Sequence, residues 1–153
     1  MFHRIDHVAL VVADLDEAIG VYREDLQADF YLRERNEEQG FEVAAFRVGD
    51  AHIELLAPTR PDSVLAGFVQ KHGPGLHHVA LEVRDLDRCL EGIRSRGLQL
   101  TSNTPRRGTG DSRIAFVHPK SLFGTMLELV ELPKAVGSAK EADPGANIEQ
   151  YKA

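Results

Sequence analysis

The sequence predicts an α+β fold in which one βαβββ module occurs twice. The stretch H-V-A-L-x-V-x-D-L-D begins at His7 and recurs at His78, 71 positions later. Two later pairs of segments also align: 42–50 with 113–121 at the same offset, and 52–58 with 126–133 at an offset of 74. Self-similarity at a long fixed period indicates repeated supersecondary units. We therefore expect two equivalent modules that share one core.

The first module reads as a strand, a helix and three further strands. Alternating apolar residues predict the strands, and an apolar stripe at helical spacing predicts the helix. Asp14 and Glu17 have the spacing of a capping box, which marks the start of that helix. The expected elements are a strand at 5–12, a helix at 15–25 and strands at 28–34, 41–48 and 52–57.

The second module repeats this order. Asp85 stands where Asp14 stands in the first copy, and Gly97 suits the end of the helix. Cys89 lies on the apolar stripe of that helix, so we expect its thiol to be packed in the core. The expected elements are a strand at 77–83, a helix at 86–96 and strands at 98–102, 113–118 and 125–131.

The modules are expected to form one domain over residues 1–133. They span about 4–58 and 75–132, and the segment 62–72 between them has the pattern of a short helix. The last stretch, 134–153, lacks apolar periodicity and is expected to be a polar C-terminal tail.

Composition narrows the function classes. The net charge of −6 argues against nucleic acid or an anionic membrane as the main partner. Cys89 is the only cysteine, so no internal disulfide can form and a reducing cytoplasm is expected. No signal-peptide pattern opens the sequence, and no apolar run approaches the ~18 residues that a membrane span needs.

Strand alternation places four polar side chains on the face away from the helices. His7 and His78 open the first strand of their modules, and Glu54 and Glu128 lie on the last. Two modules related by a pseudo-twofold axis bring equivalent positions together at that axis. Two imidazoles and two carboxylates form a ligand set for a divalent metal ion, and six-coordinate Co²⁺, Mn²⁺ or Mg²⁺ suits the carboxylates, with Zn²⁺ as an alternative.

The chain resembles the vicinal oxygen chelate (glyoxalase-like) superfamily, and within it the methylmalonyl-CoA epimerase family. The resemblance covers residues 4 to about 132 and is most specific in the run from LLAPTRPDS to GLHH, with FVHPK and LELVE later. It implies a sheet cup around a metal site held by His7, Glu54, His78 and Glu128.

The resemblance also implies a reaction. The enzyme would interconvert the R and S forms of methylmalonyl-CoA at C2 through a metal-stabilised enolate, with Co²⁺ as the first choice of ion. Glu128 is the expected base on one face. The family has a further glutamate after its EEQG segment, and Glu42 is the nearest match here. Strand parity groups Glu42 with Ala44 and Phe46, on the face expected to point inward. The expected partners are an acyl-CoA substrate and a second copy of the chain in a homodimer.

Other functions remain open at this level. A glyoxalase I-type lyase uses a similar ligand set, whereas an extradiol dioxygenase would leave Glu54 without a role. A drug-sequestering protein of the same modules would lack the metal, and a plain interaction module would need none of these residues. The sequence does not separate methylmalonyl-CoA from ethylmalonyl-CoA, because one methylene changes binding by only ~1–3 kcal/mol.

Several further polar residues have two interpretations. His77 is expected to face away from the metal, because it neighbours His78 on a strand, and to pack or support the ligands. His52 shares the face of Glu54 and is either an active-site contact or a sheet residue. The candidates for the cavity mouth and for the CoA phosphates are His118, Arg60, Arg106, Arg107 and Lys120, which are otherwise solvated side chains.

Overall fold

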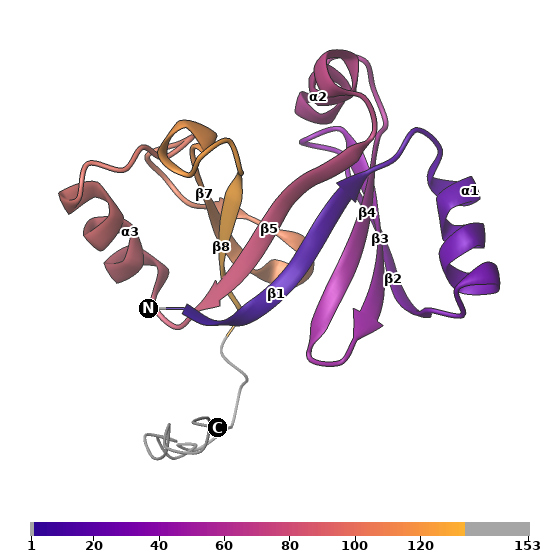
Figure 1. Ribbon diagram of the computed structural model, residues 1–153, viewed down its shortest axis with the longest axis horizontal. Coiled ribbons are helices and arrows are strands. Elements are labelled where there is room, and N and C mark those ends of the chain that lie inside the picture. Colours follow the sequence, from indigo (N-terminus) through magenta and orange to yellow (C-terminus); the bar gives the residue numbers. More distant parts are fainter. Residues whose placement is uncertain (1, 134–153) are drawn as a thin grey trace, which may run out of the picture.

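The computed structural model describes residues 2–133, and the predicted tail at 134–153 lies outside these residues. Eight strands form one curled sheet in the order β2-β3-β4-β1-β5-β8-β7-β6 (Figure 1). The first four strands belong to the first module and the last four to the second. The predicted α+β fold with two repeated modules is confirmed.

The first module follows the predicted order. Its helix continues beyond Gly20 as a π-helical turn, which accounts for the longer helix expected at 15–25. The elements are β1 (Phe2–Val11), α1 (Leu15–Gly20), the π-helical turn (Val21–Asp25), β2 (Asp29–Asn36), β3 (Phe41–Val48) and β4 (Ala51–Pro58).

The linking segment forms α2 (Val64–His72), as expected. The second module then comprises β5 (Gly75–Val83), α3 (Leu86–Ser95), β6 (Arg106–Arg107), β7 (Arg113–Val117) and β8 (Leu127–Glu131), with short 3₁₀ turns at Thr109–Asp111 and Pro119–Ser121.

The strand expected at 98–102 does not form. Leu100 makes an isolated bridge to Val117, and the next pairing with β7 comes only at β6. The reason is local, because Pro105 has no N–H to donate and the Ser102 hydroxyl bonds the backbone of Thr104 instead. The outer edge of the second module is therefore an extended loop, which lies beside the site described below.

Aspartate side chains begin both module helices, as the repeat predicts. Asp14 accepts a hydrogen bond from the Glu17 amide at 3.0 Å, and Asp85 accepts one from the Arg88 amide at 2.9 Å. Each satisfies an N–H that the first turn of a helix leaves without a partner. The start of each helix is thereby fixed relative to the strand before it.

The two faces of the sheet are covered differently. On the outer face, α1 packs on β3 and β4, while α3 packs on β7 and β8. Cys89 is 4% exposed within the α3 cluster, as predicted for a packed thiol. On the inner face, Leu65 of α2 packs over Val11, Val43 and Leu56. The rest of the inner face is left for a cavity.

The two modules meet through β1 and β5, which pair antiparallel. Within each module the first strand also pairs in parallel with the last, β1 with β4 and β5 with β8. These four central strands therefore carry the repeat-equivalent side chains toward a common centre. None of the helices in residues 2–133 has the length and apolarity that a membrane crossing requires.

Candidate active site

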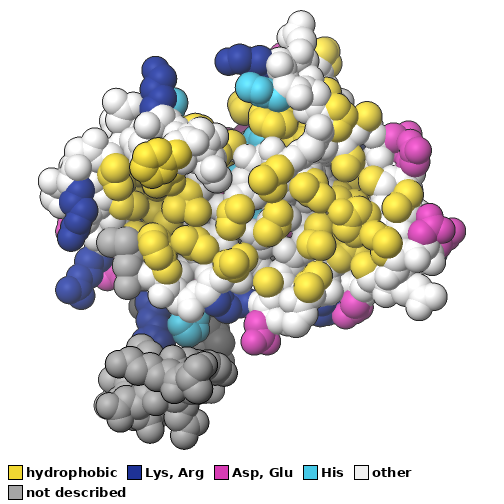
Figure 2. Space-filling view, viewed as in Figure 1, with side chains coloured by type: hydrophobic (Ala, Val, Ile, Leu, Met, Phe, Trp, Pro, Cys, Tyr) yellow, Lys and Arg dark blue, Asp and Glu magenta, His cyan; other side chains and the backbone are white. Residues whose placement is uncertain are grey.

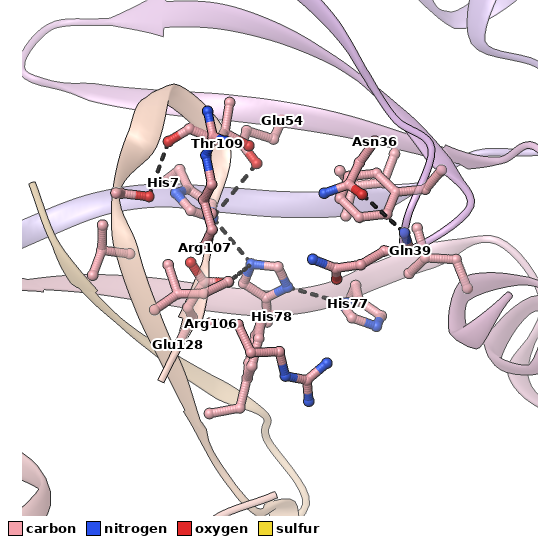
Figure 3. A pocket seen from close by; sticks show the side chains of 18 of the residues that line it. His7, Asn36, Gln39, Glu54, His77, His78, Arg106, Arg107, Thr109 and Glu128 are labelled. Atoms are coloured by element: carbon pink, nitrogen blue, oxygen red, sulfur yellow. Dashed lines mark hydrogen bonds and ion pairs between the residues drawn. The ribbon is translucent and has the colours of Figure 1, made fainter. Parts of the chain in front are cut away.

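A cavity of about 530 Å³ lies on the inner face of the sheet and is lined from both modules. Its floor is formed by the central strands, and side chains of α2, the 36–39 turn and β6 form its rim (Figure 3). His7, Glu54, His78 and Glu128 all line it, and each is less than 9% exposed. The alternation argument thus placed all four side chains on the correct face.

Three of these side chains converge on one point. Nε2 of His7 lies 3.0 Å from Nε2 of His78, which in turn lies 3.0 Å from Oε2 of Glu128. Within residues 2–133 they form the one group of this kind, with all donor atoms within 4.8 Å of one another. Glu54 lies beside this cluster, with Oε2 3.6 Å from Nε2 of His7 (Figure 3).

This geometry fits a divalent cation. Neighbouring ligands at right angles, each ~2.1 Å from an ion, are ~3.0 Å apart. A small movement of Glu54 would complete the set of two imidazoles and two carboxylates that the sequence predicts. Burial of three carboxylates, Asp6, Glu54 and Glu128, beside two imidazoles also leaves negative charge that a divalent cation would balance.

The same charge shifts the protonation of the site. Burial would lower the pKa of His7, but the hydrogen bond to Asp6 and the charges of Glu54 and Glu128 outweigh it and raise the pKa to about 9. Burial, together with the charge of Glu128, raises the pKa of Glu54. Without a metal ion, these neighbours therefore favour the protonated form of His7.

Two residues that precede the histidines also reach the cavity. Oδ2 of Asp6 accepts a hydrogen bond from Nδ1 of His7 at 2.9 Å, and Nδ1 of His77 lies 2.8 Å from Nδ1 of His78. Alternation does not hold at His77, because it lies on the same face of the sheet as His78 and lines the cavity. It is not part of the ligand cluster, and the expected supporting contact with His78 is present. Asp6 was missed, although the repeat aligns it with His77.

Glu42 is not in the cavity, and its expected inward placement is wrong. Its carboxylate accepts hydrogen bonds from Arg33, whose guanidinium also bonds Asp16 on α1. Parity correctly groups Glu42 with Ala44 and Phe46, but that face packs against α1. Each face of β3 is mostly apolar with one charged residue, Glu42 on one and Arg47 on the other, so alternation did not identify the inner face.

Near the cavity, the inner face of β3 carries hydrocarbon side chains instead. Phe41 lines the cavity, Val43 packs beneath α2, and Ala45 is opposite Glu54 on β4. Titratable side chains from neighbouring elements of the first module also line the cavity, among them Tyr31, Glu38 and His52. The rings of Tyr31 and His52 contact each other with centroids 5.2 Å apart.

The basic residues expected at the mouth divide into two groups. Arg106 and Arg107 line the cavity rim, and Arg107 pairs with Asp111. Arg60 also reaches the rim, but its guanidinium donates to the carbonyls of Glu37 and Glu38 at 2.9 Å each. Its main contacts therefore hold the 36–40 turn.

His118 and Lys120 do not line the cavity. Nδ1 of His118 accepts a hydrogen bond from the Lys120 amide at 3.1 Å and caps the 3₁₀ turn that follows. Of their two interpretations, a place at the cavity mouth is not supported, and the alternative of side chains outside the site holds.

Comparison with known proteins agrees with this architecture. Residues 6–116 match the glyoxalase/bleomycin resistance protein/dioxygenase superfamily. The chain is 32% identical to an ethylmalonyl-CoA/methylmalonyl-CoA epimerase of Cereibacter sphaeroides over 134 residues, 86% of this chain and 100% of that protein.

Solved structures give the same result. Methylmalonyl-CoA epimerase from Mycobacterium tuberculosis has a TM-score of 0.82 at 42% identity, covering 86% of this chain and 89% of that one. A methylmalonyl-CoA epimerase in complex with methylmalonyl-CoA and NH₄⁺ has a TM-score of 0.84 at 36% identity, covering 88% and 97%.

The chain therefore belongs to the glyoxalase/bleomycin resistance protein/dioxygenase superfamily. Within it, the chain belongs to the methylmalonyl-CoA epimerases, a family of enzymes. The family predicted from the repeat and its flanking motifs is confirmed.

Proposed function

We propose that this protein epimerises methylmalonyl-CoA at C2 with the help of a divalent metal ion. The observation that carries the proposal is the convergence of His7, His78 and Glu128 in a cavity shared by both modules. The relatives named above supply the substrate class.

The proposed ion site consists of His7, Glu54, His78 and Glu128. When bound, a divalent ion supplies Lewis-acid polarisation of the thioester carbonyl, which lowers the energy of the enolate. We propose Co²⁺ first, with Mn²⁺, Mg²⁺ and Zn²⁺ as alternatives.

Glu128 is the proposed base on one face of C2. Its carboxylate takes the C2 proton, and the electron pair of that C–H bond moves into the enolate. An acid on the opposite face then protonates C2. Glu128 releases its proton to water, and the second group regains one from water, so that both groups return to their starting state. Since the inner face of β3 carries hydrocarbon side chains near the cavity, we propose that this second group is one of Tyr31, Glu38 or His52, which line the cavity.

The acyl-CoA would enter over β6. Arg106 and Arg107 are exposed at the rim, where their guanidinium groups can meet the phosphates of CoA. The apolar lining deeper in the cavity, including Phe116, Met126 and Val130, suits the short acyl chain. This pocket chemistry accommodates methylmalonyl and ethylmalonyl groups alike.

Proton exchange at C2 is the direct test. Metal-reconstituted protein would be incubated with one enantiomer of methylmalonyl-CoA in D₂O, with ethylmalonyl-CoA and a glutathione hemithioacetal as parallel substrates. We expect deuterium at C2 together with inversion. If neither occurs for a CoA thioester while the hemithioacetal is consumed, the protein is a glyoxalase I-type lyase; if no substrate reacts and no metal binds, it is a binding protein.

We also propose a homodimer formed through the outer face of β1 and β5. The clusters under α1 and α3 reach these strands only at Leu10 and Val83. Figure 2 shows hydrophobic side chains across this face with charged groups mostly at its edge. Ile5 and Leu76 are 51% and 56% exposed there.

The buried free thiol of Cys89 supports a reducing compartment, and we propose the cytoplasm.

A further inference from the structure

The two central strands contain matching irregularities beside the site. Along the β1–β5 pairing, Ile5 is opposite Leu81 but His7 is opposite Ala80, so Asp6 is an extra residue in β1. Farther along, Ala9 is opposite His78 but Leu10 is opposite Leu76, so His77 is an extra residue in β5. A β-bulge of this kind breaks the alternation of side chains. It explains why two consecutive residues of each strand reach the same cavity.

The two bulged residues are equivalent in the repeat. The offset of 71 that aligns His7 with His78 also aligns Asp6 with His77. Each contacts Nδ1 of the histidine that follows it, at 2.9 Å and 2.8 Å respectively. The same arrangement thus occurs once in each module, on either side of the pseudo-twofold axis.

These contacts determine which ring nitrogen of His7 and of His78 can bind a metal ion. An ionised carboxylate only accepts hydrogen bonds, so Nδ1 of His7 carries a hydrogen and Nε2 points into the cluster. For Nε2 of His78 to bind an ion, Nδ1 of His78 must likewise carry a hydrogen, and His77 must accept it. The ring of His77 is held for this by Phe68 of α2, with centroids 4.8 Å apart.

We infer that Asp6 and His77 are positioning residues for a metal ion, one for each histidine ligand. This inference rests on the proposed metal site. Asp6 is a carboxylate and His77 an imidazole, so the two histidines are not equivalent. A charged acceptor makes the stronger hydrogen bond and the more basic imidazole, and His7 is therefore the more tightly held ligand.

The affinity of the protein for a metal ion reports on these two positioning roles independently of turnover. Binding of Co²⁺ to chelator-treated protein would be measured by calorimetry for the parent, Asp6→Ala, Asp6→Asn, His77→Ala and His77→Gln. We expect Asp6→Ala to weaken binding by ~10–100-fold, the usual range for partners of metal ligands. His77→Ala should weaken it less, and the variants that retain an acceptor, Asp6→Asn and His77→Gln, should recover part of each loss.

His3→Ala is the matched control. His3 is the extra residue at a third register shift of the same strand pair, between Phe2 and Arg4, and it is exposed. Its removal should leave Co²⁺ affinity unchanged. If His3→Ala lost as much Co²⁺ affinity as Asp6→Ala, a change at any bulge of this strand pair would be enough to weaken metal binding. That result would overturn the assignment of Asp6 and His77 as positioning residues.

Nitrogen-15 NMR of the Zn²⁺-loaded protein gives a second readout. We expect hydrogen-bonded Nδ1–H signals from both His7 and His78 in the parent, and loss of the His7 signal alone in Asp6→Ala. Asp6→Ala binding Co²⁺ within twofold of the parent would overturn the inference while leaving the proposed function intact. A parent that binds no divalent ion would overturn the proposed function itself, and this inference with it.

Discussion

At the scale of single residues, His7 and His78 are the ligands whose loss should weaken metal binding most. His7→Ala or His78→Ala should abolish most metal binding and nearly all turnover, because each removes a central atom of the cluster. Glu54→Gln should be milder, since its amide oxygen can still coordinate and Glu54 lies at the cluster edge, 3.6 Å from His7. Metal content measured by plasma mass spectrometry on purified variants checks this. Full occupancy in His7→Ala would contradict the ligand assignment.

Glu42 should be dispensable. Glu42→Gln removes a half-exposed ion pair with Arg33, which at a protein surface contributes ~0–1 kcal/mol. We expect unchanged Co²⁺ affinity and epimerisation within about twofold of the parent, because the side chain faces α1 and not the cavity. Steady-state epimerisation assays would measure this, with Glu128→Gln as the inactive comparison. A loss of several orders of magnitude in Glu42→Gln would mean that β3 rearranges when substrate binds.

The protonation of His7 predicts two opposite pH dependences. Its pKa is raised to about 9 in the folded protein from an ordinary value of 6.5, so in metal-free protein its contribution to stability is complete below pH 6.5 and lost as the pH rises through about 9. The melting temperature of chelator-treated protein should fall over this window. Affinity for Co²⁺ should rise over it, because the ion displaces that proton. Thermal melts and titrations at several pH values test both trends, and His7→Gln should flatten each one.

At the scale of elements, Cys89 tests whether α3 serves only to pack against the outer face of the sheet. Its side chain is 4% exposed, and burial raises the pKa of the thiol. Because the neutral buried thiol is a poor nucleophile, it should react with thiol reagents only after unfolding. Cys89→Ala should keep full turnover at a cost of ~1 kcal/mol in the free energy of unfolding. Rapid inactivation by a thiol reagent, prevented by substrate, would instead place Cys89 near the site.

At the scale of the whole molecule, the exposed hydrophobic side chains Ile5 and Leu76 on the outer face of β1 and β5 predict dimerisation. Leu76→Glu places a charge on that face, opposite Leu10, where burying it without a partner is unfavourable. We expect the parent to sediment as a dimer and Leu76→Glu as a folded monomer that still binds metal. Analytical ultracentrifugation with circular dichroism distinguishes these states. A parent that remains monomeric at high concentration would contradict the proposed interface.

Much of the site was predictable because it lies on regular strands within a repeat. Alternation placed His7, Glu54, His78 and Glu128 on the inner face, and the internal repeat implied that they meet. Residues on one face of one strand are related by a fixed period, so their relative orientation follows from the chain itself. The helix starts at Asp14 and Asp85 were predictable for a similar reason, because capping depends on contacts three residues away.

Only the tertiary structure decided where a side chain points when that depends on the register between two strands, or on which face of a strand a helix covers. Asp6 and His77 reach the cavity through bulges. A bulge is defined by the pairing of β1 with β5, whose paired residues lie 64 to 81 positions apart in sequence, so no local pattern marks it. Glu42 points outward because α1 covers its face of β3. Each face of that strand is mostly apolar with one charged residue, so the sequence of β3 does not tell the two faces apart. The sequence by itself therefore determined which elements form and which residues share a face. Only the packing of distant elements decided which face encloses the site and which neighbours support it.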